Sequence, residues 1–246
     1  MKLYLTSSPI GAYRQWGQQD YPGVNPANNL VEELKKDWKD DAKCLLISAD
    51  PDAFEMNDAM ARDFEEKFAK SELSVDRFDV CDHRNGQDII EDIFSYDFIM
   101  LGGGHVPTQN AFFDELKLTP KIQKFDGIVI GISAGTMNCA KIVYAQPESE
   151  GESIDPNYER FIEGLGLTKF MVIPHYQAIK DDVLDGKRVM EEISYPDSIG
   201  REFYALTDGS FILQRDGAKK LYGEAYLVKD GEIRKICENN QVLDID

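Results

Sequence analysis

The chain has 246 residues, of which 42% are hydrophobic, and this is enough to bury a sizeable core. Its 45 acidic and 27 basic residues give a formal net charge of -18. A chain this acidic repels phosphate backbones, and the sequence has no basic stretch that would offset the repulsion, which argues against a nucleic-acid partner.

Short apolar runs alternate with helical segments over the first part of the chain. Strands are predicted at residues 3–6, 44–48, 75–80, 98–101 and 128–132, and helices at 29–38, 54–70, 88–94, 109–116 and 134–142. The strand runs lack polar alternation, as expected of strands that are covered on both faces. This repetition predicts a three-layer α/β/α fold with a mostly parallel, flavodoxin-like sheet.

The C-terminal part of the chain has a different pattern. Short strands are predicted at 204–206, 210–214, 218–222, 226–229 and 233–237, with Asp-Gly dipeptides at positions 208, 216 and 230. Asp-Gly favours tight turns, so we expect C-terminal antiparallel hairpins attached to the main sheet. No repeat or Pro/Ser-rich linker interrupts the sequence, which predicts a single domain over residues 1–246.

A possible nucleophile lies at the junction between a predicted strand and a predicted helix. The motif Gly131-Ile132-Ser133-Ala134-Gly135 has the spacing of a nucleophile elbow, in which small residues allow a sharp turn that exposes the serine hydroxyl. The following helix N-terminus offers amide groups to a developing oxyanion. The simpler interpretation is a tight turn with a capping serine.

A serine needs a base, and the base needs a carboxylate that orients it. His175 is the one histidine after Ser133, and it ends a short apolar run, where α/β sheets bind ligands. Asp208 ends another apolar run and is the best candidate for the carboxylate by position. The acidic loop at 146–156 provides competing carboxylates, at Glu148, Glu150 and Glu152.

Three glycines, Gly102-Gly103-Gly104, follow the predicted strand at 98–101 and precede His105. Their spacing matches neither a P-loop nor a dinucleotide-binding motif. One amide of this loop, together with the amide of Ala134, could hold the oxyanion; a packing turn is the alternative.

Taken together, the LGGG loop, the GISAG elbow, the IDPN segment, the IPHY histidine and the TDGS aspartate resemble a known family. It is the serine peptidase family of aspartyl dipeptidase (dipeptidase E) and cyanophycinase, whose fold is like that of class I glutamine amidotransferases. The resemblance implies a nucleophile, a base and two oxyanion-hole amides, at Ser133, His175, Gly104 and Ala134. Asp208 matches the third member of the triad, where the dipeptidase has a glutamate, and the loop glutamates remain alternatives.

The sequence departs from the family after the glycine loop, where His105 replaces the usual asparagine. That position borders the family's substrate site, so a preference for N-terminal aspartate is not implied. We expect His105 and Glu150 to contribute to substrate binding, with the acidic loop attracting a free amino terminus.

These observations predict a serine peptidase that hydrolyses dipeptides or short peptides through Ser133, His175, Asp208 and an acyl-enzyme. A lipase-like hydrolase would place its acid before its histidine, and an amidotransferase would need a cysteine at the elbow. The remaining alternative is a non-catalytic flavodoxin-like binding protein or a lapsed hydrolase. Four widely spaced cysteines, without a zinc spacing, predict no metal or cofactor. We expect a cytoplasmic protein, monomeric or homodimeric, with no membrane partner.

Overall fold

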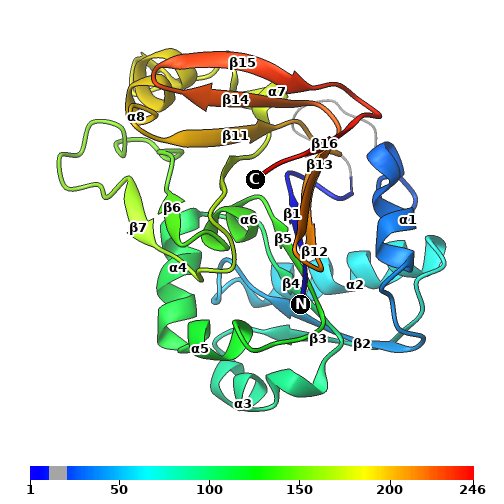
Figure 1. Cartoon of the computed structure of the whole chain (residues 1–246). Helices are drawn as coiled ribbons and strands as arrows, with labels where there is room; N and C mark the ends of the chain where they lie inside the picture. The colour runs from blue at the N-terminus through cyan, green and yellow to red at the C-terminus, as the bar shows by residue number, and fades with distance from the viewer. Residues whose placement is uncertain (11–20) are drawn as a thin grey trace.

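The computed structural model describes residues 1–10 and 21–246. Its largest sheet has eight strands in the order β16-β13-β12-β1-β5-β4-β2-β3 (Figure 1). Five neighbouring strands of this sheet run parallel. They are β1 (Lys2–Thr6), β5 (Ile128–Ile132), β4 (Phe98–Leu101), β2 (Ala42–Ile47) and β3 (Val75–Cys81). The predicted mostly parallel central sheet is therefore confirmed.

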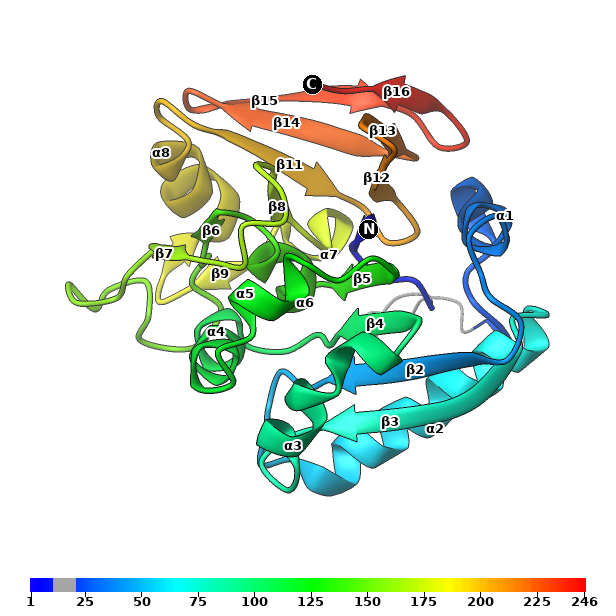
Figure 2. The same cartoon turned by 60° about the horizontal axis from the view of Figure 1, so that its bottom comes forward.

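Successive residues of the parallel strands pack into different cores, because side chains alternate between the faces of a sheet. In β2, Leu45 and Ile47 belong to one core, whereas Cys44 and Leu46 belong to the other. The first core includes residues of α3 (Gly86–Glu91), α4 (Val106–Glu115) and α5 (Thr119–Ile122). The second core includes residues of α1 (Leu30–Lys35) and α2 (Phe54–Lys70). Figure 2 shows α2 lying along β2 and β3, as the three-layer arrangement requires.

The C-terminal strands are divided between two sheets. β12 (Phe211–Arg215), β13 (Ala218–Tyr222) and β16 (Val242–Asp244) extend the large sheet in antiparallel fashion. β11 (Glu202–Leu206), β14 (Ala225–Lys229) and β15 (Glu232–Cys237) form a second sheet with β8 (Met171–Ile173), at the top of Figure 1. The antiparallel hairpins were predicted correctly, but the predicted attachment to the main sheet was wrong for β11, β14 and β15. The reason is that β14 pairs with β11, which is itself paired with β8.

The helix predicted at 134–142 is shorter than expected. α6 covers Ala134–Asn138, and β6 (Ile142–Tyr144) follows it. β6 pairs with β7 (Phe161–Glu163), and Ala140 forms a bridge to Thr168. These non-local strand partners satisfy backbone groups that a longer helix would have paired internally, so tertiary pairing overrides the local preference.

The remaining elements are short. They are α7 (Tyr176–Ile179), β9 (Val183–Leu184), β10 (Lys187–Arg188), a π-helical turn (Val189–Ser194), α8 (Tyr195–Asp197), and the 3-10 turns Ala27–Asn29 and Ile93–Ser95. All four cysteines are free and buried. Among the described residues, no helix has the length and apolar character needed to cross a membrane. The same residues contain no cluster of three His, Cys, Asp or Glu side chains suited to a metal ion.

Candidate active site

Ser133 lies at the sharp turn between β5 and α6. Its φ of 50° and ψ of -112° form a strained combination for a residue with a side chain. The glycines on either side allow the turn to pack. A Cβ on Gly131 would lie 2.6 Å from Thr136 Cα, and a Cβ on Gly135 would lie 2.2 Å from the Leu101 carbonyl oxygen. The glycines of the motif are therefore required by close backbone contacts.

His175 and Asp208 form a hydrogen-bonded pair. His175 follows β8 with a left-handed backbone (φ 57°), and its Nδ1 lies 2.7 Å from Asp208 Oδ1. Their side chains are only 13% and 4% exposed. An ionised carboxylate can only accept hydrogen bonds, so Nδ1 carries the proton and Nε2 is the basic atom of the neutral ring.

Two polar residues that the sequence analysis did not single out hold this pair in place. The hydroxyl of Ser7, which is fully buried, donates to Asp208 Oδ1 at 2.6 Å and accepts from the His175 backbone N–H at 2.8 Å. Gln177 donates to Asp208 Oδ2 at 2.7 Å and accepts from the Asp208 backbone N–H. Ser7 directly follows β1, a parallel neighbour of β5, and this position is the sequence signal that places it at the same sheet edge as Ser133.

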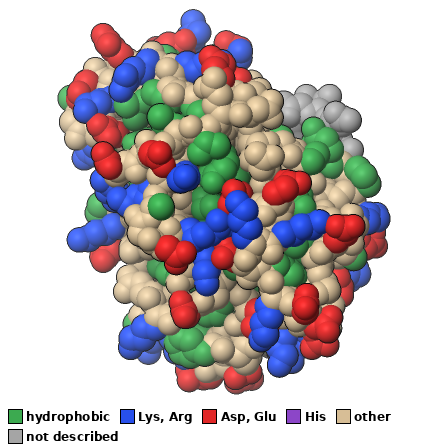
Figure 3. Space-filling view, turned by 45° about the vertical axis from the view of Figure 1, so that its right-hand side comes forward, with side chains coloured by type: hydrophobic (Ala, Val, Ile, Leu, Met, Phe, Trp, Pro, Cys, Tyr) green, Lys and Arg blue, Asp and Glu red, His purple; other side chains and the backbone are tan. Residues whose placement is uncertain are grey.

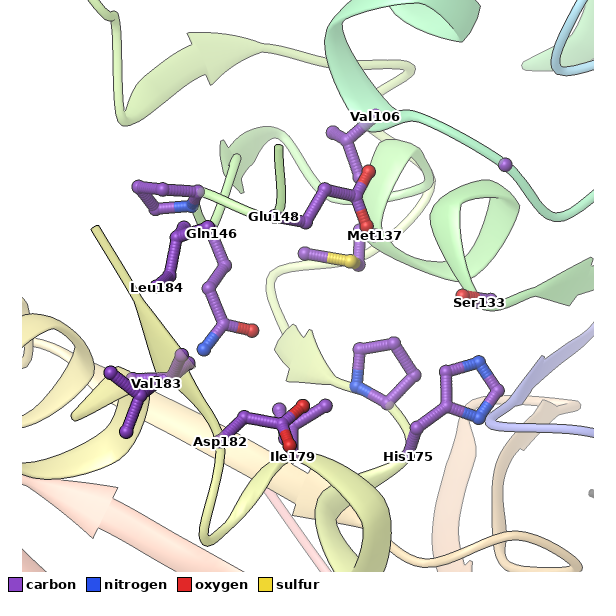
Figure 4. Close-up of a pocket in the computed structure, with 14 residues that line it drawn as sticks. Val106, Ser133, Met137, Gln146, Glu148, His175, Ile179, Asp182, Val183 and Leu184 are labelled. Atoms are coloured by element: carbon purple, nitrogen blue, oxygen red, sulfur yellow. The ribbon is translucent and has the colours of Figure 1, made fainter. Parts of the chain in front are cut away.

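Ser133 and His175 line a common pocket of about 180 Å³ (Figure 4). In Figure 4 both side chains lie on the same side of this pocket. The wall also contains Gly104, Gln146, Glu148, Asp182 and a set of apolar residues. Most of the apolar part is formed by Val106, Met137, Ile179, Val183, Leu184 and Val189. The structure thus brings the predicted hydroxyl, imidazole and carboxylate to one rim of the large sheet.

The glycine loop lies directly beside the elbow. A Cβ on Gly103 would be 3.5 Å from Ser133 Cβ, because β4 and β5 are adjacent parallel strands. Gly104 is exposed at the pocket wall, and Ala134 is the buried first residue of α6. Both residues predicted to donate oxyanion-hole amides are therefore near Ser133: Ala134 follows it in the chain, and Gly104 follows the neighbouring strand.

The glutamates of the acidic loop occupy three different environments. Glu152 binds His105 Nε2 at 2.8 Å and accepts backbone hydrogen bonds from Glu148 and Ser149. Glu150 is exposed and, like His105, is not among the described residues that line the pocket. Glu148 does line it. Loss of hydration raises the pKa of the Glu148 carboxyl, with repulsion from Glu152 adding to the rise and His105 opposing it.

The comparisons with known proteins agree with this fold. The sequence profile of peptidase family S51 matches residues 18–222. A peptidase from an acI-B1 Actinobacterium superimposes with a TM-score of 0.65 and 13% identity, over 99% of this chain and 96% of the other. A protein from Listeria monocytogenes EGD-e, provisionally named peptidase E, superimposes with a TM-score of 0.58 and 16% identity, over 96% and 98% of the two chains. No curated protein matches the chain in sequence.

Proposed function

Because the chain belongs to peptidase family S51 and is therefore a serine peptidase, we propose that it hydrolyses dipeptides or short peptides through Ser133, His175 and Asp208. The observation that carries the proposal is the 2.7 Å bond between His175 Nδ1 and Asp208 Oδ1, beside a pocket that also contains Ser133. That bond fixes the imidazole with Nε2 as its proton acceptor.

The first half of the reaction forms an acyl-enzyme. His175 Nε2 takes the proton of the Ser133 hydroxyl as Oγ attacks the carbonyl carbon of the scissile peptide bond. The backbone N–H groups of Gly104 and Ala134 hold the resulting oxyanion. The C–N bond then breaks, and the leaving nitrogen receives the proton from His175.

The second half releases the acyl group. A water molecule gives one proton to His175 Nε2 and attacks the acyl carbon, and Ser133 Oγ leaves with that proton. Asp208 stays ionised throughout and stabilises the imidazolium that forms in each half. The small size of the pocket, about 180 Å³ against the roughly 300–1,000 Å³ of typical ligand pockets, favours short substrates over folded proteins.

The test combines turnover with covalent labelling. The Ser133→Ala variant should lose all measurable hydrolysis of a dipeptide library, because no other hydroxyl is aligned with His175 in this proposal. A fluorophosphonate probe should add to the wild-type chain at Ser133, as seen by peptide mass spectrometry. The Ser149→Ala variant, which changes an exposed serine of the acidic loop, should keep both properties.

Retained hydrolysis in Ser133→Ala would contradict the mechanism. If the wild-type chain neither turned over any peptide nor reacted with the probe, a lapsed hydrolase would be the better description.

A further inference from the structure

The wall of the active-site pocket carries negative charge on two separate elements. Glu148 belongs to the acidic loop after β6, and Asp182 follows α7. Figure 4 shows their carboxylates entering the pocket from opposite walls, with Ser133 and His175 to one side. No lysine or arginine is among the described residues that line the pocket.

Several neighbouring acidic side chains have a cationic or backbone partner. Glu152 binds His105, Asp181 lies 4.0 Å from Lys180, and Asp185 accepts backbone hydrogen bonds from Gly151 and Ser153. Within residues 1–10 and 21–246, neither Glu148 nor Asp182 forms an ion pair with a lysine or arginine. Glu148 accepts a backbone hydrogen bond from Val106 and lies near His105 and His175, but no lysine or arginine of the described chain offsets the two carboxylates.

The space between these carboxylates and the catalytic side chains has an apolar boundary. Val106, Met137 and Ile179 contribute to it. A lysine or arginine side chain would match this surface, because each has an apolar stem that ends in a charged head. An aspartyl side chain would bring a third carboxylate into the pocket, and like charges repel.

We propose that this pocket selects substrates that carry a positive charge on the residue at the acyl side of the scissile bond, with Glu148 and Asp182 binding that charge. The proposal rests on the peptidase function proposed above and names its substrate class. The cation is either the ammonium or guanidinium of a side chain or the α-ammonium of a free amino terminus.

The experiment compares p-nitroanilides of lysine, norleucine and aspartate, each with a free and with an acetylated amino group. Lysine and norleucine have stems of the same length, so their kcat/KM ratio isolates the side-chain charge. For the wild-type chain we expect the lysine substrate to exceed norleucine about tenfold, which is typical of one charge-assisted contact, and aspartate to be the poorest.

Two pairs of variants locate the effect. Glu148→Gln and Asp182→Asn should each reduce the lysine-to-norleucine ratio of kcat/KM several-fold. Glu150→Gln and Asp181→Asn remove the same charge from nearby positions that do not line the pocket, and should leave the preference unchanged.

The acetylated substrates identify the source of the charge. A preference for lysine that survives acetylation assigns the cation to the side chain, whereas a Glu148-dependent loss of rate on acetylation assigns it to the α-ammonium. Equal rates for lysine and norleucine with no effect of acetylation would overturn the inference, as would a preference for aspartate. Hydrolysis of neutral substrates in that case would leave the peptidase function intact, so the two failures are distinguishable.

Discussion

The Asp208 carboxylate is held by three side-chain donors, one that follows β1 and two from the segment that follows β8. Ser7 and His175 donate to Oδ1, and Gln177 donates to Oδ2. A carboxylate with three fixed donors cannot rotate away from the imidazole without losing hydrogen bonds in a buried site. Ser7 also accepts the His175 backbone N–H, so it fixes both members of the pair. We therefore regard Ser7 as a positioning residue.

The Ser7→Ala variant tests this role. Because the imidazole and the carboxylate both lose a fixed contact, we expect kcat to fall about tenfold while KM changes little. Ser7→Thr retains a hydroxyl and should recover most of kcat. A Ser7→Ala variant that unfolds earlier in urea but keeps the wild-type kcat would show that the hydroxyl serves stability alone.

For single residues, the sequence predicted some features of the site and missed others. The Gly-x-Ser-x-Gly spacing predicted the sharp turn at Ser133 because steric contacts require those glycines, and such requirements are local. The pairing of His175 with Asp208 could be ranked by chain position but not chosen over the loop glutamates, because it depends on how two sheets meet. Ser7 carries no motif, and its contacts cross most of the length of the chain.

At the scale of elements, β12 has a different function at each end. Asp208 lies three residues before its first residue, Phe211, and Arg215 is its last. Arg215 binds Glu33 at 2.7 Å and Asp37 at 2.6 Å, and so ties the strand to α1 and the residues after it. Although burial acts against it, hydrogen bonds from Lys36 and Arg215 hold the pKa of the Glu33 carboxyl below its ordinary value.

Replacing the Arg215 guanidinium should lower the free energy of unfolding and leave kcat unchanged. Arg215→Met leaves the Glu33 carboxylate, only 10% exposed, with the exposed Lys36 as its remaining cation. We expect the free energy of unfolding in urea to fall by about 2 kcal/mol. The double variant with Glu33→Gln should recover part of that loss. A fall in kcat per folded molecule would contradict the separation of the two strand ends.

The Asp-Gly dipeptides show how far local signals predict elements. Asp216-Gly217 and Asp230-Gly231 both have positive φ angles and form the turns of the β12–β13 and β14–β15 hairpins, as predicted. Asp208-Gly209 has the same composition, but it connects β11 of the small sheet to β12 of the large sheet. The local turn was predictable, whereas the sheet that each strand joins was decided by pairing with distant strands.

At the scale of the whole molecule, the net charge of -18 creates a negative field around the chain. On the face shown in Figure 3, acidic and basic side chains are intermingled, so the excess is not gathered there as one patch. A cationic substrate would gain from the overall field as well as from the pocket, and this gain depends on ionic strength.

Added salt should therefore lower kcat/KM for charged substrates more than for neutral ones. Raising the ionic strength from about 0.02 M to about 0.5 M shortens the screening length several-fold. For the lysine p-nitroanilide we expect kcat/KM to fall about fivefold, whereas the acetyl-norleucine p-nitroanilide should change little. Equal salt dependence for the two substrates would show that the net charge does not guide the substrate.

The end of β1 lies where the large and small sheets meet. The Thr6 carbonyl accepts hydrogen bonds from the Ser133 backbone N–H and the Thr136 hydroxyl, and the next residue, Ser7, contacts His175 and Asp208. Two consecutive residues therefore act as a clamp between Ser133 and the His175–Asp208 pair. Any sliding of one sheet over the other must open this clamp first, so catalytic alignment should disappear cooperatively, in a single subglobal opening, rather than by gradual loosening.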